Sequence, residues 1–227
     1  MNTMSNPPRG NETRKALIAA AIDVFGHTGF DAASTRALAQ AAGVNQALIG
    51  YHFGGKRGLY LAVFENIAEQ MQTHMAGVVD GIHLQLDELP MDDSERRARA
   101  LQLLLTLFDA FIEMLAGEAA AQWAPLVLRE QQDPTEAFDL IYDSLMGRML
   151  SLVTRLVATC SGMEEASEAC RIRTLMILGH AMVFRIARGV TKRYMHWETL
   201  TPAHVPAIKE QFRRSIESQF SEQVPLS

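Results

Sequence analysis

Apolar residues recur at spacings of three and four along most of this chain, which is the period of an amphipathic α-helix. The first run starts at Asn11, a residue type that caps helix N-termini, and Gly26 and Gly29 bracket its end. Comparable runs follow as far as residue 190. The pattern therefore predicts an all-α fold.

Residues 34–52 predict two short helices joined by a tight turn. Ser34 or Thr35 is suited to cap the first helix, Gly43 to make the turn, and Asn45 to cap a second helix of about seven residues. Two short helices joined by a glycine turn form a helix-turn-helix. In that motif the second helix presents its N-terminal residues to base edges in the major groove of DNA.

The residue types on this second helix suit DNA recognition. Side-chain amides pair with adenine and a small methyl group contacts thymine, while hydroxyl, imidazole and ammonium groups set register on phosphates. Spacing alone leaves a short core helix with a polar cap equally open. The predicted base-reading residues are Asn45, Gln46 and Ala47, and the predicted phosphate contacts are Tyr51, His52 and Lys56.

The same segment partly matches a nucleotide-binding loop. Gly50, Gly55 and Lys56 fit the pattern G-x-x-x-x-G-K, but Arg57 stands where that loop needs a serine or threonine to hold magnesium. The segment also follows a predicted helix, whereas that loop follows a strand. A helical enzyme or binding module that uses this loop is an alternative that both departures disfavour.

The rest of the chain predicts a long helix followed by a helical body. A helix should run from Lys56 to about Leu84, and a polar break with a proline covers residues 85–93. Within the body, Ser94 should open a helix that ends near Gly117. The predicted divisions are a flexible arm at 1–10, a DNA-binding domain at 11–56, a connecting helix at 57–84, a ligand-binding and dimerisation domain at 85–220 and a tail at 221–227.

Two predicted helices of the body, over residues 135–158 and 172–190, carry apolar residues on two faces. Helices buried on two sides suit a four-helix interface between two subunits, and a homodimer would read two half-sites of DNA. An ordinary monomeric core is the alternative. The predicted interface residues are Phe138, Ile141, Leu145, Leu152, Leu175, Gly179, Met182 and Ile186.

Methionine and aromatic residues of the body suit the lining of a pocket that adapts to an apolar ligand. The same residues also suit a plain core, and that reading stays open. Arg129, Glu130 and His180 are polar residues in apolar stretches. They would orient such a ligand, and a satisfied hydrogen bond inside the fold explains them equally well. The predicted pocket residues are Phe108, Phe111, Trp123, Arg129, Met146, Met149, His180 and Phe184.

Charge is divided unevenly along the chain. Residues 1–60 carry six cations and three anions, so the remainder holds 15 of the 21 cations and 23 of the 26 anions. A basic N-terminal part on an acidic body is expected when one end of a protein meets phosphate. The overall charge of −5 therefore does not argue against a nucleic-acid partner.

Other classes of protein find little support. Cys160 and Cys170 are too few for a disulfide framework or a zinc site, and His74 and His83 share no helical face, so no metal or cofactor is expected. Catalytic motifs such as G-x-S-x-G and H-E-x-x-H are missing, which disfavours an enzyme. Without an apolar run of about 18 residues, the chain is expected to be soluble and cytoplasmic, with no membrane partner.

Residues 11–65 resemble the DNA-binding domain of TetR-type transcriptional regulators. The stretch GFDAASTRALAQAAGVNQALIGYHFGGKRGLY follows that family's glycine-aromatic, S/T-T-R, A-G-V and Y-x-H-F-x-x-K-x-x-L pattern. On this resemblance Thr35 and Arg36, which begin the first short helix, join the predicted phosphate contacts. Gly50 departs from the family, because a helix former is usual there.

Two later runs, LREQQDPTEAF and GHAMVFR, are similar to the C-terminal domain of CecR-type members of that family. The resemblance implies a dimeric regulator, most simply a repressor, that binds a pseudo-palindromic operator in double-stranded DNA and is released by an unidentified apolar small molecule. The alternative is a DNA-binding protein without an effector that acts structurally or through protein partners.

Overall fold

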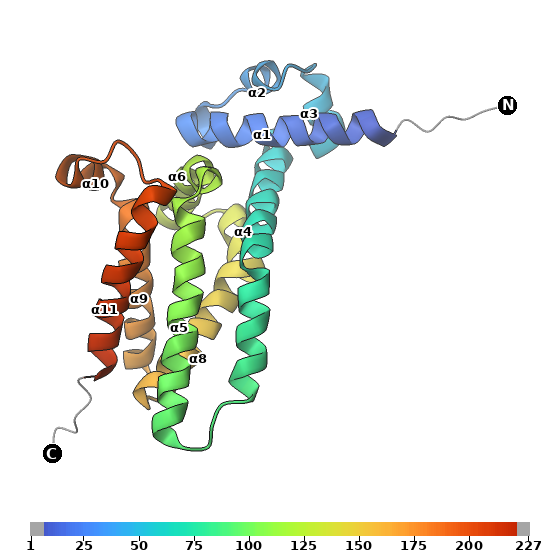
Figure 1. Ribbon diagram of the computed structural model, residues 1–227. Helices are drawn as coiled ribbons and strands as arrows, with labels where there is room; N and C mark the ends of the chain where they lie inside the picture. The colour runs from blue at the N-terminus through green and yellow to red at the C-terminus, as the bar shows by residue number, and fades with distance from the viewer. Residues whose placement is uncertain (1–6, 222–227) are drawn as a thin grey trace. The chain divides into compact units, whose positions relative to one another are not determined.

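The computed structural model describes residues 7–221, and every regular element in that range is a helix (Figure 1). The predicted all-α class is confirmed. Residues 1–6 and 222–227, which hold most of the predicted arm and tail, lie outside the described residues. The elements are α1 (Pro7–Ala32), α2 (Thr35–Ala41), α3 (Ala47–Phe53), α4 (Lys56–Asp87), α5 (Asp93–Ala116), α6 (Glu118–Gln132), α7 (Glu136–Ile141), the π-helical turn η1 (Tyr142–Met146), α8 (Gly147–Ser161), α9 (Glu168–Ile186), α10 (Arg188–Met195), the 3₁₀ turn η2 (Pro202–His204) and α11 (Val205–Ser221).

The chain forms two compact units, each built from two stretches of sequence. The first unit combines Met1–Gln70 with Gln122–Ser144, and the second combines Met71–Ala121 with Leu145–Ser227. The linear division at residue 85 remains a prediction. It did not anticipate that residues 122–144 associate with the N-terminal helices.

An apolar core holds the N-terminal helices of the first unit together. Phe25 of α1 is fully buried and meets Tyr60 of α4 edge to face, with ring centroids 5.0 Å apart. Phe30 and Phe64 extend this aromatic cluster on either side of Tyr60. Large apolar side chains contribute about 1.5 to 3 kcal/mol each when they are fully buried. Further core residues are Leu17, Leu38, Ile49, Leu59 and Val63.

The ends of α1 differ from the prediction. The helix begins at Pro7, so Asn11 lies inside it and is not its cap. Proline is well suited to the first turn, where its missing N–H has no intrahelical partner in any case. Gly29 breaks the helical geometry with φ 81° and ψ 171°, as the predicted stop requires.

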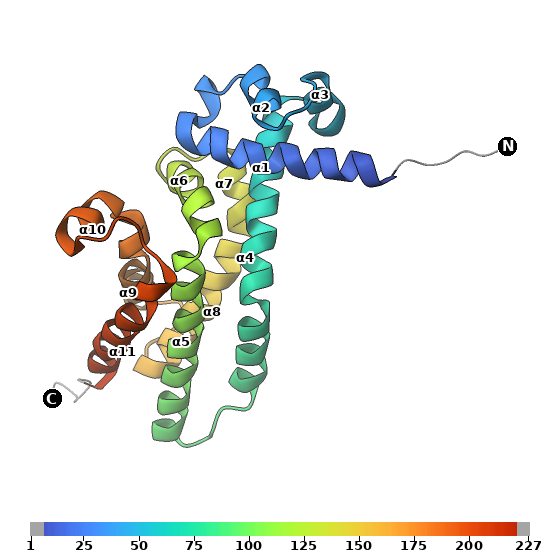
Figure 2. The ribbon, with the colours of Figure 1, turned by 45° about the horizontal axis from the view of Figure 1, so that its top comes forward.

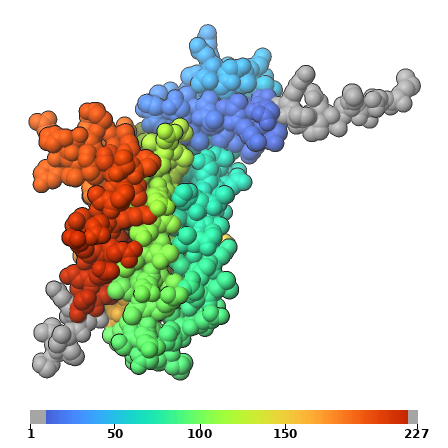
Figure 3. All heavy atoms as spheres, viewed as in Figure 1, coloured from blue at the N-terminus to red at the C-terminus, as the bar shows by residue number. Residues whose placement is uncertain are grey.

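Four helices run side by side in the second unit. α5 contacts α8, α9 and α11 (Figure 1), and the surface view shows α11 lying along α5 (Figure 3). Their buried faces include Leu104, Phe108, Leu156, Ile177 and Ile216. The exposed faces of α5, α8 and α11 are mostly polar, which is the amphipathic pattern expected of a helical bundle, whereas α9 also exposes apolar residues.

Several predicted boundaries in the body were wrong. Asp92, not Ser94, caps α5, because its side chain accepts the backbone N–H of Glu95 at 2.9 Å. The predicted helix over 135–158 is interrupted by η1, and the predicted helix over 172–190 breaks at Ala187. Pro125, which as a proline is expected to kink or split a helix, lies within a continuous α6. The helix α11 was not expected from the sequence.

Arg185, the last residue of the GHAMVFR run, stabilises the end of α5. Its guanidinium donates to the carbonyl of Leu115 at 2.6 Å and to that of Gly117 at 3.4 Å. Carbonyls at a helix C-terminus have no intrahelical partner, so a cation there satisfies them and complements the helix dipole. Burial lowers the pKa of Arg185 from its usual value, and neighbouring Arg188 adds to the effect.

Both cysteines are buried and free, which predicts slow reaction with thiol reagents. Burial raises the pKa of Cys160 to about 12, and it also raises the pKa of Cys170. At pH 8 the thiolate fraction of Cys160 should be about one in ten thousand. We expect a disulfide reagent to leave both thiols unmodified for minutes in the native protein and to modify both promptly in urea. Prompt modification of the native protein would contradict this burial.

Candidate nucleic-acid interface

The two short helices form from local contacts that the sequence predicts. The Ser34 hydroxyl accepts the backbone N–H of Ala37 at 3.1 Å and so caps α2. Gly43 adopts φ 65°, a left-handed value that the tight turn requires and glycine adopts without strain. The Asn45 side chain then accepts the N–H of Ala47 at 2.9 Å at the start of α3. Figure 2 shows α2 and α3 together beside α1.

Gln46 and Thr35 join the two helices at the surface. The Gln46 amide nitrogen donates to the Thr35 hydroxyl at 2.8 Å. One amide N–H and the amide oxygen of Gln46 are not used in this bond, and these are the two groups that pair with adenine. Asn45 already uses its side-chain oxygen as a helix cap. Gln46 is therefore better placed than Asn45 to read a base.

The surface around α3 is polar or basic and lacks acidic residues. Asn45, Gln46, Ala47 and Arg36 are exposed, and no aspartate or glutamate occurs between Asp31 and Glu65 in the sequence. Tyr51 is 82% exposed, although an aromatic ring of this size usually finds apolar cover. Its ring meets that of half-buried His52 edge to face at 4.9 Å. An exposed tyrosine on an acid-free surface suits contact with a phosphate backbone.

Two glycines bear on the geometry of α3. Gly50, the departure from the family pattern, lies inside a regular helix, and an added Cβ there would meet nothing within 4 Å. The fold therefore does not require glycine at this position. At Gly58 in the first turn of α4, an added Cβ would lie 1.8 Å from the carbonyl oxygen of Phe53. This close approach fixes the end of α3 against α4, and the need for glycine at position 58 was not expected from the sequence.

Lys56 makes several contacts inside the domain. Its ammonium group donates to the carbonyls of Ala33 at 3.0 Å and Asp31 at 3.4 Å, and it lies 4.4 Å from the centre of the Phe30 ring. These contacts satisfy carbonyls just beyond the break at Gly29 and tie the start of α4 to the end of α1. A contact between Lys56 and phosphate remains a prediction. The same contacts leave it poorly placed for a nucleotide.

A buried carboxylate supports the first unit from α6. Glu130 is 3% exposed and accepts the Tyr60 hydroxyl at 2.6 Å through one oxygen. Its other oxygen accepts the backbone N–H of Thr135 at 2.9 Å and the Thr135 hydroxyl at 2.8 Å. Burial, and then the hydrogen bond to Glu130, raises the pKa of Tyr60 above its usual range, so its hydroxyl remains a donor at neutral pH.

Two arginines add to these contacts. Arg129 donates to the carbonyl of Phe25 at 3.0 Å and lies against Gly29, where a Cβ would come within 2.8 Å of its guanidinium. Arg57 makes a two-pronged ion pair with Glu136, which raises the pKa of Arg57 and lowers that of Glu136. The run that resembles CecR thus carries structural contacts within this unit. They border a cavity of about 680 Å³ whose lining includes Phe30, Arg57, Tyr60, Arg129 and Asp133.

The predicted pocket residues have different surroundings in the structure. Phe108 and Phe111 pack with each other in the core, and Phe108 also meets Phe212 of α11 at 5.0 Å. His180 is exposed, not buried among apolar side chains. Trp123 and Arg129 belong to the first compact unit, whereas Met146, Met149 and Phe184 belong to the second. Phe108, Phe111 and Trp123 are buried as core residues, as the alternative allowed, whereas Met146, Met149 and Phe184 are half-buried.

The predicted dimer residues divide into two groups. Ile141, Leu145 and Leu152 are already buried within one chain, and Phe138 is half-buried, which leaves these residues little surface for a second subunit. On α9, by contrast, Leu175 is 60% and Ile186 43% exposed, with Gly179 exposed and Met182 half-buried between them. The exposed apolar surface of α9 also includes Ile172, Met176 and Val183, which the prediction omitted.

No group of three or more histidine, cysteine, aspartate or glutamate side chains in residues 7–221 is arranged to hold a metal ion. In the same part of the chain, no single helix is both long and apolar enough to cross a membrane.

Comparison with protein families agrees with the motifs. Residues 17–63 match the model for bacterial regulatory proteins of the tetR family, and residues 100–219 match that for the C-terminal domain of the HTH-type transcriptional dual regulator CecR. The chain is 30% identical over 192 residues to the dual regulator CecR of Shigella flexneri, covering 82% of each protein. It is 33% identical over 99 residues to the transcriptional activator FasR of Mycolicibacterium smegmatis, covering 44% of this chain and 41% of that one.

Solved structures share the fold. A TetR-like regulator from Rhodococcus sp. RHA1 superposes with a TM-score of 0.62 at 15% identity, covering 93% of this chain and 97% of the other. The regulator FadR from Bacillus subtilis, solved in complex with stearoyl-CoA, has a TM-score of 0.53 at 18% identity and covers 87% and 96%. At these identities the similarity shows the fold alone.

Proposed function

Because this chain belongs to the TetR family of transcriptional regulators and carries a CecR-type C-terminal domain, we propose that it is a homodimeric repressor. In this proposal two copies of α3 enter the major groove at two half-sites of a pseudo-palindromic operator, about 34 to 36 Å apart. A small molecule bound by the C-terminal helices lowers the affinity for that operator.

The observation that carries the DNA-binding proposal is the exposed, acid-free surface of α2 and α3. Gln46 is the proposed base reader, with Asn45 and Ala47 beside it, and Thr35, Arg36, Tyr51 and His52 are proposed to contact the backbone. Selection of bound sequences from random duplex DNA tests this proposal. We expect a palindromic consensus whose affinity falls steeply with salt, as phosphate contacts require. Recovery of random sequence would argue against a specific operator.

Removal of the Gln46 amide should change sequence preference at one position. Gln46→Ala should lose about 1 to 3 kcal/mol on the selected site and accept any base at the position that Gln46 reads. Thr35→Val, which removes the hydroxyl but keeps the shape, should partly relax the same position because the amide is no longer held. Competition binding against a panel of single-base variants measures both effects.

A double-mutant cycle separates this role of Thr35 from a contact with phosphate. If Thr35 acts through Gln46, Thr35→Val should have little effect in the Gln46→Ala background. A phosphate contact would weaken binding to every sequence equally and reduce the salt dependence in both backgrounds. Thr35→Ser retains the hydroxyl and should retain the preference of the unaltered protein.

The exposed apolar positions of α9 support the proposal of a two-fold dimer. Counted from Gly179, apolar residues occur seven, four and three positions before it and three, four and seven after it. Two antiparallel copies of α9 that cross at Gly179 would therefore pair apolar with apolar along the contact. Glycine costs about 1 kcal/mol inside a helix relative to alanine. Nothing lies within 4 Å of a Cβ added at Gly179, so a second helix would explain it.

Release by a small molecule is the part of the proposal that rests most on relatives. The Bacillus subtilis neighbour was solved with stearoyl-CoA, so fatty acyl compounds are the first effectors to test. A ligand releases DNA only through a difference in affinity between the free and DNA-bound states. A mobility-shift titration with these compounds should release the operator. A DNA-bound state that no effector changes would favour a regulator that acts through DNA or protein partners alone.

Whether binding represses or activates is tested by transcription. The relatives described above include a dual regulator and an activator, so repression is a proposal and not a property of the family. A reporter gene placed under the selected operator should be expressed more strongly when the gene that encodes this protein is deleted from the cell. We also propose that the protein acts in the cytoplasm, where it meets the chromosome.

A further inference from the structure

A groove in the second unit lies between the C-terminal part of α4 and the N-terminal part of α5. It has a volume of about 500 Å³, within the range of small-molecule sites. Its apolar floor is made by Ile82 and Leu103, which are buried, and by half-buried Val78. Its polar rim is made by Gln85, Arg99, Gln102, Thr106 and Arg213.

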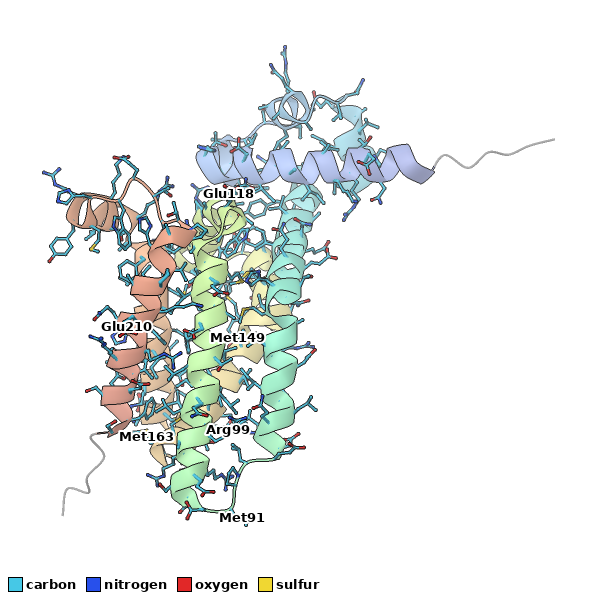
Figure 4. The ribbon with its side chains drawn as sticks, in the orientation of Figure 1. Met91, Arg99, Glu118, Met149, Met163 and Glu210 are labelled. Carbon is cyan, nitrogen blue, oxygen red and sulfur yellow. The ribbon has the colours of Figure 1, made fainter. Side chains whose placement is uncertain are left out.

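The charge of the groove is positive. Its lining contains two arginines and no carboxylate. Arg213 is already paired with Asp109 at 2.9 Å. Arg99, in contrast, donates to the amide oxygens of Gln85 and Gln102 and makes no ion pair with the residues that the structure describes. Its guanidinium, labelled on α5 in Figure 4, therefore bridges two helices without a counter-ion.

Neutral acceptors hold Arg99 in place without reducing its charge. The Gln85 amide nitrogen donates to the carbonyl of Gly81 at 3.0 Å, which turns the amide oxygen toward Arg99. A planar guanidinium fixed in this way is well suited to a carboxylate or phosphate, which it binds through two parallel hydrogen bonds. The bridge thus prepares one end of the groove for an anion.

The wall of the groove is open to the helix backbone at Gly77 and Gly81. These residues lie one turn apart on α4, and a Cβ at either would meet nothing within 4 Å. Neither has the positive φ that demands glycine. Two glycines inside a helix cost about 1 kcal/mol each relative to alanine. The two glycines leave space in which a bound molecule would lie directly against the backbone of α4.

We infer that this groove binds an amphipathic anion, with its alkyl chain along Gly77 and Gly81 over Ile82 and Leu103 and its acidic head on Arg99. The inference rests on the proposed ligand control and names the chemical class of the effector. The head is the carboxylate of a free fatty acid or the phosphate of an acyl thioester, both of which a guanidinium accepts. No residue predicted for a pocket from sequence takes part in it.

Equilibrium dialysis of the full-length protein with dodecanoate below its micellar concentration tests the inference. We expect saturable binding, and binding of dodecan-1-ol, which has the same chain without the charge, at least tenfold weaker. A parallel dialysis with lauroyl-CoA compares its affinity with that of dodecanoate. The tighter of the two shows whether the groove prefers the carboxylate of a fatty acid or the phosphate of an acyl thioester. Failure of both anions to bind, or equal binding of the alcohol, would overturn the inference.

Paired variants locate the site. Arg99→Gln removes the charge and keeps an amide, and it should weaken dodecanoate at least tenfold, whereas Arg96→Gln on the exposed face of the same helix should not. Gly81→Leu fills the groove and should abolish binding, whereas Ala76→Leu on α4 should not. Thermal melts confirm that the variants fold. Unchanged binding in Arg99→Gln and Gly81→Leu would place the anion elsewhere and overturn the assignment.

Two further readouts separate this inference from the proposed function. If dodecanoate binds through Arg99 but leaves operator affinity unchanged, the groove stands and ligand release by this compound fails. If no DNA is bound at all, the regulator proposal fails while the dialysis result stands. If Gly81→Leu changes the oligomeric state and neither anion binds, the glycines serve a second copy of the chain, and the inference is overturned.

Discussion

Leu175→Glu should convert the protein into a monomer and lower its operator affinity at least 100-fold. Leu175 is 60% exposed on α9 and lies four residues before Gly179, in the apolar surface proposed to meet a second copy. A carboxylate there would lose its hydration on dimerisation without gaining a partner, which costs several kcal/mol. A dimer that contacts two half-sites at once typically binds with an affinity about 10²- to 10⁴-fold higher than that of a single half-site contact. Analytical ultracentrifugation measures the mass, and a mobility shift measures the affinity.

Leu84→Glu is the matched control for this experiment. Leu84 is 71% exposed on α4 and lies outside the apolar surface of α9. It receives the same charge in place of the same side chain, so general effects of the substitution appear in both variants. We expect this control to remain dimeric and to bind DNA normally. A dimeric Leu175→Glu that still binds the operator tightly would show that the contact between subunits lies on another face.

The helix-turn-helix could be predicted because it depends on contacts between near neighbours in sequence. Ser34, Gly43 and Asn45 act within three residues of their own positions, as helix caps or as the residue in a left-handed turn. Cap and turn chemistry has a specific residue signature. The same local rules misplaced the start of α5 by two residues, because Asp92 and Ser94 are both good caps and only one of them has the required backbone geometry.

The contacts from α6 and α7 that stabilise the DNA-binding domain could not be predicted, because they join distant parts of the chain. Tyr60 and Glu130 are 70 residues apart, and Arg57 and Glu136 are 79 apart. Glu130 was identified only as a polar residue in an apolar stretch. Its partner is determined by how α6 and α7 pack beside α4, and amphipathic periodicity carries no information on that packing. The carbonyl partners of Lys56 could not be predicted for the same reason, since a lysine that binds phosphate and one that binds carbonyls look alike in sequence.

The pocket prediction rests on a less specific pattern. Methionine and aromatic residues mark apolar environments, and an apolar core satisfies that pattern as well as a ligand site does. The groove at Arg99 is recognised instead by two glycines without a steric purpose and by a cation with neutral acceptors. Both features become visible only when the neighbours of each side chain are known.

Glu130→Ala should lower the free energy of unfolding by about 3 kcal/mol or more. The substitution removes a buried carboxylate and leaves the Tyr60 hydroxyl and the Thr135 N–H without their acceptor. Hydrogen bonds to charged groups contribute about 1.5 to 3 kcal/mol each, and a buried donor left unpaired costs about 1 to 3 kcal/mol. Urea denaturation at a fixed protein concentration measures the change, since dimerisation makes stability depend on concentration.

Tyr60→Phe and Gln131→Ala complete this comparison. Tyr60→Phe removes one donor and leaves Glu130 its two bonds to Thr135, so it should cost about 1 to 2 kcal/mol. Gln131 is the exposed neighbour of Glu130, and its replacement should change stability by about 0.5 kcal/mol or less. In the Glu130→Ala background Tyr60→Phe should cost less than it does alone, because the hydroxyl it removes has already lost its acceptor. Additive losses would mean that Tyr60 and Glu130 stabilise the unit independently and that the hydrogen bond between them contributes little.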